Sequence, residues 1–370
     1  MKKLQHFAIL ILSILYFQNT FAQTFKWNAQ FEVIADNREY FSPYGFSQTL
    51  IGTRLKPEVG FALDDKQRVM VGASYFLLVG DSAFSQPVIP VAYYNYGNKG
   101  LDFYAGFVPR QYQQHQFPLA FYTDSLHYFS PVNQGFVANY EKKWGKFSIS
   151  QSGMFDFFMN YDYGAREQFV TGIAGNARYK FVQLNNYYYY HHRASDNAPG
   201  ERRTISDNGC AGITGGIHFE RVGATVRAEA GALFSWNRTR PEPHYRSTGL
   251  YADALVYLWK FGAQFTHYKG DGIFIPLADP LYRSGNYTRI TAIVKPFFRF
   301  AKVDRHCDVQ FRFNFHKIAG EWNSSQQMVI QVNIDKFEKK NQRPVPNDEI
   351  QRFFQEIPDV QEVQPDVLGD

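Results

Sequence analysis

The feature that most limits the fold is a long alternation of apolar and polar residues that recurs along the chain. It begins at 25–33, where FKWNAQFEV places an apolar side chain at every second position, and it returns at 222–234, 309–316 and 328–335. Strict alternation indicates a strand with two different faces. Soluble strands usually stop near ~5–6 residues, whereas a tilted membrane strand needs ~9–11. The pattern therefore predicts strands that cross a membrane, with lipid on one face and water on the other.

The first 22 residues differ from the rest of the chain and predict export. Lys2 and Lys3 precede an apolar run at 7–17, and Thr20 and Ala22 are small residues of the kind a signal peptidase reads. We therefore expect residues 1–22 to be a signal peptide. No later stretch of ~18 apolar residues could form a membrane helix. A chain that is 45% hydrophobic and 18% aromatic is left with strands as its means of entering a membrane.

The strand pattern recurs in 16 segments. It predicts an all-β fold, a transmembrane up-and-down antiparallel β-barrel of about 16 strands (14–18) over residues 23–337. The expected strands are 24–35, 48–63, 68–79, 87–96, 101–109, 131–141, 146–158, 167–179, 181–192, 209–219, 221–236, 248–259, 261–269, 285–300, 306–317 and 326–337.

The connections between these strands alternate between short and long. Longer polar segments are expected at 36–47, 80–86, 110–130, 159–166, 193–208, 237–247, 270–284 and 318–325. Tight turns lie between them. Outer-membrane barrels place short turns on the periplasmic side and long loops outside, so both termini are predicted to be periplasmic. A soluble β-sandwich or β-propeller is the alternative, but the chain has no repeat of ~40–50 residues that would mark propeller blades.

Three stretches give the chain a family resemblance: PEVGFALDDKQRVMVG at 57–72, DFYAGFVPR at 102–110 and YTDSLHYFSP at 122–131. Together with the predicted signal peptide and the long alternating strands, they resemble the porin-like outer-membrane β-barrels of Bacteroidota. The resemblance covers residues 23–337. It implies a location in the outer membrane and a barrel architecture, and it implies no functional residues.

Inward-facing side chains are the first candidates for function, because a barrel of 16 strands is wide enough for an aqueous channel. The lumen-lining candidates are Arg54, Lys56, Tyr187, Tyr189, Arg227, Glu229, Arg289, Lys295, Arg299 and Arg312. Basic residues outnumber acidic ones in this set, which predicts a weak preference for anions. A mixed lining that only keeps the interior hydrated explains the same charges equally well. The two tyrosines come from NNYYYYHHR at 185–193, whose alternate members Tyr188 and Tyr190 are expected to face lipid.

The longest expected outer loop is the third, QYQQHQFPLAFYTDSLHYFSP at 111–131. In porins the third loop commonly folds inward and narrows the channel. Arg110, His115, Asp124 and His127 are therefore candidates for a pore constriction. A loop that stays at the surface and contacts nothing is the alternative.

Signals for catalysis, metals and cofactors are weak. The chain has no GxSxG, HExxH, CxxC or phosphate-binding glycine loop, and YKGDGIF lacks the further carboxylates of a calcium loop. His127 near Ser125 and Ser130, and His267 beside Thr266, are neighbours expected by chance among 10 histidines. We therefore expect no enzyme, no metal and no cofactor.

A change of composition marks the end of the barrel. Residues 338–370 carry an excess of acidic side chains, and Asn347 is a plausible cap for a short amphipathic helix that ends before Pro358. This polar periplasmic tail would plug the barrel, bind a periplasmic protein or stay loose.

These features together predict an outer-membrane porin-like channel for the passive diffusion of small hydrophilic solutes, mildly anion-preferring. The alternative is an outer-membrane scaffold or binding barrel that displays loops and recruits a periplasmic protein through residues 338–370. An outer-membrane hydrolase is the third reading. The expected partners are outer-membrane lipid and small hydrophilic solutes, with no nucleic acid, and monomers and oligomers fit the sequence equally.

Overall fold

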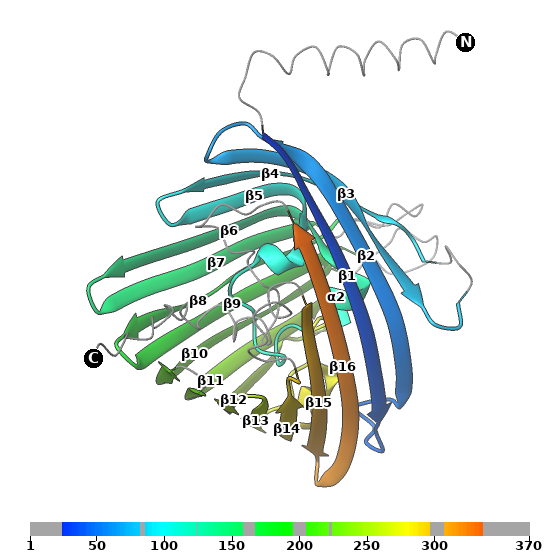
Figure 1. Cartoon of the computed structure of the whole chain (residues 1–370). Coiled ribbons are helices and arrows are strands. Elements are labelled where there is room, and N and C mark those ends of the chain that lie inside the picture. Colours follow the sequence, from blue (N-terminus) through cyan, green and yellow to red (C-terminus); the bar gives the residue numbers. More distant parts are fainter. Residues whose placement is uncertain are drawn as a thin grey trace, which may run out of the picture.

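The computed structural model describes residues 24–81, 86–123, 125–157, 167–194, 205–221, 224–296 and 307–335. These segments form one closed antiparallel barrel of 16 strands, in which each strand lies beside its neighbours in sequence and β1 lies beside β16 (Figure 1). The predicted all-β, up-and-down barrel is confirmed. The predictions made for residues 1–22 and 338–370, and those for Asp124 and Arg299, lie outside the described residues.

The strands are long, from 9 residues in β5 to 17 in β10 and β11. They are β1 (Thr24–Glu39), β2 (Gln48–Ala62), β3 (Gln67–Leu78), β4 (Ile89–Asn98), β5 (Leu101–Pro109), β6 (Val132–Trp144), β7 (Phe147–Phe157), β8 (Gln168–Tyr179), β9 (Val182–Ala194), β10 (Ile205–Arg221), β11 (Ala224–Arg240), β12 (Tyr245–Leu258), β13 (Phe261–Gly270), β14 (Asn286–Val294), β15 (Cys307–Ile318) and β16 (Glu321–Asp335). The short helices η2 (Arg110–Tyr112), α2 (Ser125–Phe129) and η3 (Pro280–Ser284) lie in the connections. None of the described helices is long and apolar enough to cross a membrane.

Two of the expected outer loops are largely strand. β11 continues to Arg240 and β12 begins at Tyr245, so little of 237–247 is loop. β15 and β16 are joined by Ala319 and Gly320, with φ of 49° and 99°, which places both residues in the left-handed region that a tight turn requires. The prediction failed here because these hairpins continue beyond the apolar part of the barrel surface. Where both faces of a strand meet water, the alternation that identifies a strand is lost.

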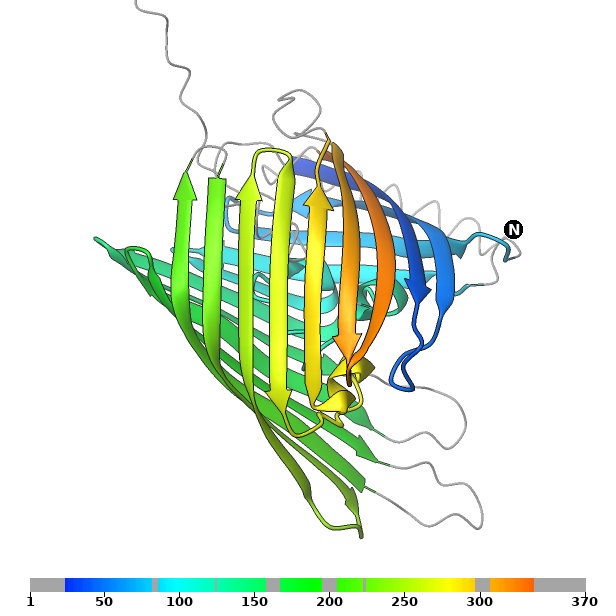
Figure 2. The same ribbon diagram turned by 90° about the horizontal axis from the view of Figure 1, so that it is seen from below.

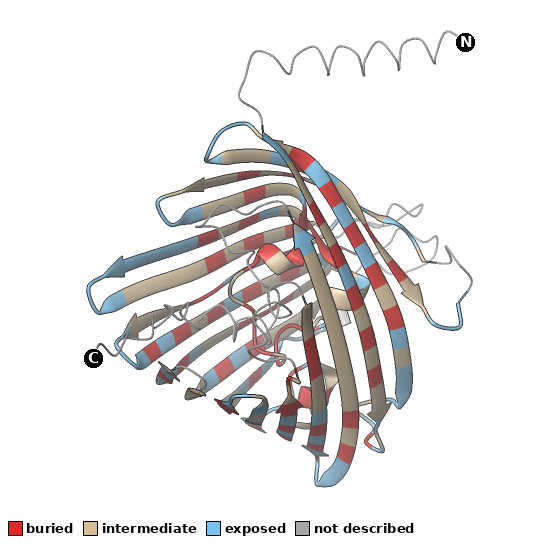
Figure 3. Ribbon diagram, in the orientation of Figure 1, coloured by how far each residue is buried: buried red, intermediate tan, exposed pale blue. Residues whose placement is uncertain are grey.

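Burial alternates along strands such as β1, β2 and β9, as the banding in Figure 3 shows. Apolar side chains such as Leu55, Leu184 and Phe265 are exposed on the outer face. A closed barrel pairs its backbone groups internally, and an apolar outer face suits contact with lipid. The described strands therefore form an outer-membrane type of barrel. Near the short-turn rim, large aromatic side chains are exposed, as in the aromatic girdles of such barrels: Trp144, Phe147, Tyr179, Trp259 and Phe261.

The main hydrophobic core lies inside the barrel. The third loop (residues 110–131) and the seventh loop (residues 271–285, which contains η3) both fold inward (Figures 1 and 2). Thr123 N donates to Leu277 O at 2.7 Å and Asp279 N donates to Leu119 O at 3.0 Å, so the two loops bind each other. The core they form with the wall includes Phe117, Phe121, Tyr122, Tyr189, Tyr251, Tyr268, Ile275, Leu281, Tyr282 and Tyr287.

Candidate functional site

The third loop is anchored in the lumen by Arg110. Its guanidinium binds the Asp156 carboxylate on β7 and donates to the Tyr122 hydroxyl at 2.7 Å, and it also donates to the Ser130 carbonyl. Arg110 and Asp156 are both buried. This predicted constriction residue therefore holds the two ends of the loop against the wall, and its charge is already compensated by Asp156.

The other described constriction candidates face cavities. His115 Nε2 lies 2.6 Å from Ser150 Oγ, and its backbone N donates to Ser152 Oγ at 2.9 Å, so this part of the loop is fixed on β7. His127, on α2, lines a pocket on the other side of the loop. Burial, with further contributions from the guanidinium groups of Arg110 and Arg54, lowers the pKa of His127 to about 3. Its imidazole is therefore neutral at physiological pH.

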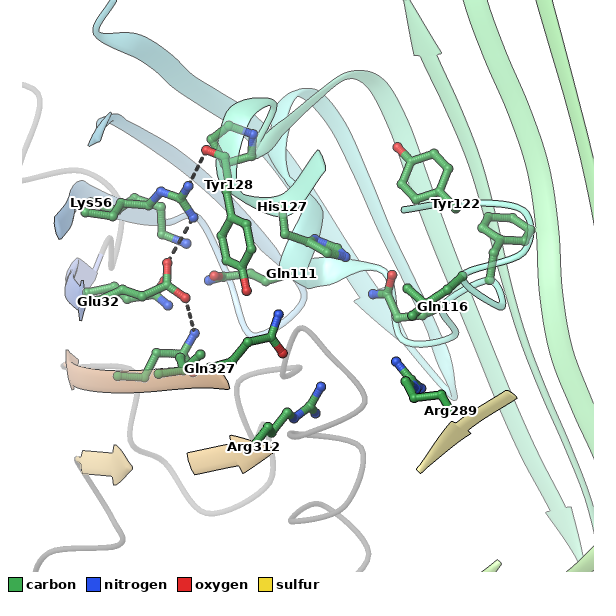
Figure 4. Close-up of a pocket in the computed structure, with 17 residues that line it drawn as sticks. Glu32, Lys56, Gln111, Gln116, Tyr122, His127, Tyr128, Arg289, Arg312 and Gln327 are labelled. Atoms are coloured by element: carbon green, nitrogen blue, oxygen red, sulfur yellow. Dashed lines mark hydrogen bonds and ion pairs between the residues drawn. The ribbon is translucent and has the colours of Figure 1, made fainter. Parts of the chain in front are cut away.

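An enclosed pocket of about 80 Å³ lies between the third loop and the wall of β1, β2 and β14–β16. Figure 4 shows Lys56, Glu32, Gln327 and Arg312 on the wall side, with His127 and Tyr128 on the loop. Four of the predicted lumen residues line it: Arg54, Lys56, Arg289 and Arg312. We call this space the basic pocket. The sequence predicted that these side chains face inward, because alternate residues of a strand point to the same side. The inward positions of neighbouring strands meet on one surface.

A second cavity, of about 490 Å³, opens on the short-turn side of the loop. Tyr187, Arg227 and Glu229 line it, together with His115. Tyr189 is fully buried against Phe117 and Tyr122, so it supports the third loop. Lys295 is buried too, with Nζ 3.9 Å from Asp308 Oδ2.

These cavities follow one another along the lumen. A vestibule of about 360 Å³ on the long-loop side shares Leu119, Tyr128, Arg289 and Gln327 with the basic pocket, and the basic pocket shares Gln116 with the cavity on the short-turn side. Side chains of the third and seventh loops pack in the lumen within the main hydrophobic core. The basic pocket lies between the two larger cavities, because it shares lining residues with each of them.

The outer face carries a separate polar cluster at the long-loop end of β9–β11. His192 Nδ1 lies 2.8 Å from Asp207 Oδ1, the Tyr190 hydroxyl donates to the same oxygen at 2.9 Å, and Arg240 donates to Oδ2 at 3.0 Å. The His192 ring stacks on Phe169, with 5.1 Å between ring centroids. Because Asp207 is an acceptor, it fixes the proton of a neutral His192 on Nδ1. Nε2 is then the nitrogen that can accept a proton.

An apolar groove of about 540 Å³ lies on the outer face of β10–β13, below this cluster. Small residues form its floor, and larger ones flank it: Ala211, Gly212, Ile213, Ala232, Leu233, Phe234, Thr248, Gly249, Leu250, Lys269 and Gly270. Leu250 is 70% exposed and Ile213 is 54% exposed, so the groove opens outward.

A histidine–hydroxyl pair lies beside the groove. His267 Nδ1 is 2.9 Å from Thr288 Oγ1, and His267 is opposite Ala252 in the β12–β13 register. Thr266, the residue next to His267 in sequence, faces inward and donates to Asp253. The histidine therefore meets a threonine on the next strand, and reading neighbours along the chain could not reveal this pair.

Other histidine–hydroxyl pairs face the lumen. His316 lies between Tyr287 Oη, at 2.8 Å from Nδ1, and Ser325 Oγ, at 3.1 Å from Nε2. His115 and Ser150 form the second such pair. Within the described part of the chain, no group of three or more His, Cys, Asp or Glu side chains is placed to hold a metal ion.

Sequence reasoning missed the whole outer-face cluster. Polar residues near the long-loop rim were expected to be loop, as for 193–208, which in fact includes the start of β10. The sequence offered one signal of this cluster. Tyr190 is predicted to face outward, and His192, two residues further along the same strand, must then face outward too. The partner Asp207 lies 15 residues further on, and only the β9–β10 register brings the two together.

Comparison with known proteins identifies one family. A family model described as "Lipid A 3'-O-deacylase-type" matches residues 18–340. A search of curated proteins finds no match.

Several solved outer-membrane proteins are similar in structure. A loop-deletion mutant of OmpT from Vibrio cholerae has a TM-score of 0.49 at 10% identity, covering 85% of this chain and 100% of that one. OprB from Pseudomonas putida has a TM-score of 0.46 at 10% identity, covering 84% and 94%. An anion-selective porin from Comamonas acidovorans has a TM-score of 0.46 at 11% identity, covering 85% and 99%.

The family match corrects one prediction. The absence of familiar catalytic motifs led us to expect no enzyme, and this is wrong, because the matching family is one of deacylases. Motifs such as GxSxG mark one way of building a hydrolase on one fold. Register neighbours on separate strands of a barrel, such as His192 and Asp207, lie close in space without forming a short motif in the sequence.

Proposed function

Because this chain belongs to the lipid A 3'-O-deacylase-type family, we propose that it hydrolyses an acyl ester of lipid A at the outer face of the barrel. One observation carries the choice of site. His192, held by Asp207 through Nδ1, lies on the outward face at the long-loop end of β9. Lipid A occupies the outer leaflet, so its esters lie at the membrane surface on this side of the protein.

The chemistry follows from the orientation of the imidazole. His192 Nε2 takes a proton from a water molecule, and the resulting hydroxide adds to the ester carbonyl carbon. The bond between this carbonyl carbon and the sugar oxygen then breaks, and His192 returns the proton to the sugar oxygen. The products are a free fatty acid and a sugar hydroxyl. Asp207 stabilises the imidazolium that forms, as a carboxylate does in other histidine bases.

The surroundings support binding of this substrate. The apolar groove on β10–β13 offers a place for an acyl chain near the cluster. Arg240 binds Asp207, and Arg238 is opposite Asp207 in the β10–β11 register, which adds positive charge at the rim where the phosphates of lipid A would lie. Guanidinium groups bind phosphates well because their donors match phosphate oxygens in pairs.

The filled lumen also favours the outer face. The third and seventh loops pack aromatic side chains into the interior of the described barrel, whereas the outer face is open to a lipid with several acyl chains. The luminal pairs His316–Ser325 and His115–Ser150 have the right atoms for catalysis but lie inside the barrel, away from the lipid-facing surface. The Thr288–His267 pair, beside the groove, is the alternative catalytic pair on the same face.

The test compares two histidines of the outer face. The full-length protein, purified and mixed with lipid A in detergent micelles, is assayed for fatty acid release by mass spectrometry. We expect His192→Gln to lower the rate by ~10²–10⁴-fold, the usual range for a general base. His267→Gln is the matched control and should stay within about threefold of the wild type, since the base is elsewhere.

Each other outcome decides against part of the proposal. If His267→Gln is inactive and His192→Gln is active, Thr288 and His267 form the catalytic pair. If the wild-type protein, folded as judged by heat-modifiable migration on a gel, leaves lipid A intact, the deacylase proposal is wrong.

We propose passage of small anions as a second function, on the observation that the basic pocket shares lining residues with the cavity on either side of it. Its four basic side chains would favour anions over cations. In planar bilayers the protein would give small conductance steps with an anion bias in the reversal potential. Bilayers that stay sealed, or a cation bias, would refute this function and leave the outer-face activity standing.

The ends of the chain have proposed roles as well. We propose that residues 1–22 direct export and that residues 338–370 meet a periplasmic protein, because both ends of the described barrel lie on its short-turn side. Loss of outer-membrane assembly after deletion of 1–22, with normal assembly after deletion of 338–370, is the expected result in a membrane fractionation experiment.

A further inference from the structure

Lysines gather along one part of the short-turn rim. Three consecutive hairpin turns contain them, at 98–101, 140–147 and 179–182, and Glu141 is the single acidic residue in these three stretches. The exposed lysines of the turns are Lys99, Lys142, Lys143, Lys146 and Lys180. Glu141 Oε1 lies 3.5 Å from Lys143 Nζ, in an exposed pair. This part of the rim, which we call the lysine rim, therefore presents a net positive charge to its surroundings.

Backbone hydrogen bonds hold the three turns side by side. Lys180 N donates to the Lys146 carbonyl oxygen at 3.0 Å, which joins the β8–β9 turn to the β6–β7 turn. Glu141 N donates to the Gly100 carbonyl oxygen at 2.8 Å, which joins β6 to the β4–β5 turn. The three hairpins follow one another along one edge of the barrel (Figure 1). Their lysines therefore form one cluster on a fixed backbone.

Exposed aromatic rings border these lysines on the lipid-facing side of the strands. Trp144 is opposite Phe147 in the β6–β7 register, and Phe147 is opposite Tyr179 in the β7–β8 register, so the three rings form one outward row. Lys142 Nζ lies 4.9 Å from the centroid of the Trp144 ring, and Lys180 Nζ lies 5.6 Å from that of the Tyr179 ring. Exposed rings at a barrel rim lie at the level of the lipid headgroups. The lysine stems follow the rings, and the ammonium groups reach the headgroup layer.

Another turn of the same rim has a different charge. The β2–β3 turn contains Asp64, Asp65 and Lys66, and Asp64 Oδ1 accepts from Lys66 N and Gln67 N at 2.7 Å each. Two carboxylates there accompany one ammonium group. An excess of positive charge is therefore no general property of the short turns of this barrel, and it coincides with the row of rings on β6–β8.

This combination fits an anionic lipid better than a soluble acidic protein. The row of rings continues into the apolar outer face, because Val182 is opposite Tyr179 in the β8–β9 register, and Val182 and Leu184 are 50% and 51% exposed. A soluble protein could reach the ammonium groups but not the apolar strands beneath them. A phospholipid contacts both, because its phosphate lies at the rim and its acyl chains lie along the strands.

We propose that the lysine rim is a binding site for anionic phospholipid in the leaflet on the short-turn side. The ammonium groups of Lys142, Lys146 and Lys180 bind the headgroup phosphate, and the rings of Trp144 and Tyr179 contact the upper part of the acyl chains. This binding goes beyond ester hydrolysis at the long-loop rim and does not depend on it.

The experiment measures which lipid the full-length protein retains. The protein in detergent micelles is mixed with equal amounts of phosphatidylglycerol and phosphatidylethanolamine that carry the same acyl chains, and bound lipids are identified by native mass spectrometry. We expect phosphatidylglycerol to be retained in preference. Lys142→Gln, Lys146→Gln and Lys180→Gln should each reduce the preference by roughly two- to fivefold, since a lysine near an anionic membrane surface contributes about 1 kcal/mol. Lys66→Gln is the matched control and should behave as the wild type does, because two aspartates accompany this lysine in its turn.

Salt gives a second readout. Exposed charges are screened over ~10 Å at 0.1 M salt and over ~3 Å at 1 M, so the preference should fall as ammonium acetate is raised over this range. Equal retention of the two lipids by the folded wild type overturns the proposal and leaves the lysine rim to an acidic protein. A preference that all three variants keep also overturns it, because the lipid would then bind elsewhere on the barrel. A preference that salt does not reduce would show that the lysine charges do not cause it.

Discussion

The inner and outer faces of β9–β14 use the same residue types in opposite ways. Inside, His191 is fully buried and pairs with Gln168, and Tyr189 is packed against the third loop. Outside, the adjacent His192 pairs with Asp207 on a surface open to lipid. A shift of one residue along the strand therefore separates a histidine that packs inside the barrel from one that pairs with a carboxylate on the outer face.

If the proposed functions are correct, the two faces form separate functional compartments. Inward polar groups hold the third and seventh loops in place or form the basic pocket. Outward polar groups gather at one rim, beside an apolar groove. A substitution on one face should therefore leave the readout of the other face unchanged.

The largest effect is expected at Asp207. Replacement by Asn keeps the shape of the side chain but removes the charge that orients His192, and the rate of fatty acid release should fall by ~10²–10⁴-fold. The single-channel conductance in planar bilayers should be unchanged. A loss of both readouts would show that the variant has misfolded or that the two faces are coupled.

The next effect is expected at Arg110. Arg110→Ala leaves Asp156 buried without its partner, which costs roughly 3–5 kcal/mol for a buried pair. The third loop should then leave the lumen more readily, so stability against denaturant falls and the single-channel conductance rises. Lys143→Ala is the control, because its pair with Glu141 is exposed and contributes about 0–1 kcal/mol. Unchanged conductance in Arg110→Ala would show that the loop does not limit the pore.

A smaller effect is expected in the groove. Ala232→Leu places extra methyl groups on its floor and should raise KM for lipid A by roughly tenfold, with little change in kcat, since an overfilled apolar site typically loses ~1–3 kcal/mol. Ala228→Leu lies on the same face of β11 outside the groove and serves as the control. If both variants behave alike, the groove does not bind the acyl chain.

The smallest effect is a pH dependence at His127. Its pKa falls from 6.5 to about 3 when the loop is in place, so the docked loop binds a proton less readily than the undocked one. This contribution to stability is complete above pH 6.5 and is lost as pH falls from 6.5 toward 3. Wild type and His127→Gln should therefore keep a constant difference in Tm above pH 6.5, and the wild type should lose Tm relative to the variant below it. Parallel Tm curves throughout would contradict the shift.

The sequence predicts the barrel well because strand faces are a local property. Residues 24–33 already show the alternation, and the same period recurs in all 16 strands. The same alternation predicts that Arg54, Lys56, Arg289 and Arg312 face inward, and these four side chains line one pocket.

Features that depend on register or loop folding could not be predicted. The pairing of His192 with Asp207 and of His267 with Thr288 depends on how neighbouring strands align. The inward fold of 271–285 depends on contacts with a third loop about 150 residues earlier in the chain. Neither leaves a mark in a short stretch of sequence, which is also why the catalytic character of the family was missed.

The hydrogen bonds between the third and seventh loops have a consequence for engineering and for evolution. Thr123 and Leu277, and Leu119 and Asp279, join two insertions that lie on distant hairpins. If either loop were transplanted alone into another barrel, the backbone groups that hydrogen-bond to the other loop would lose their partners. The third and seventh loops therefore depend on each other. We expect related chains to have both loops long or both loops short.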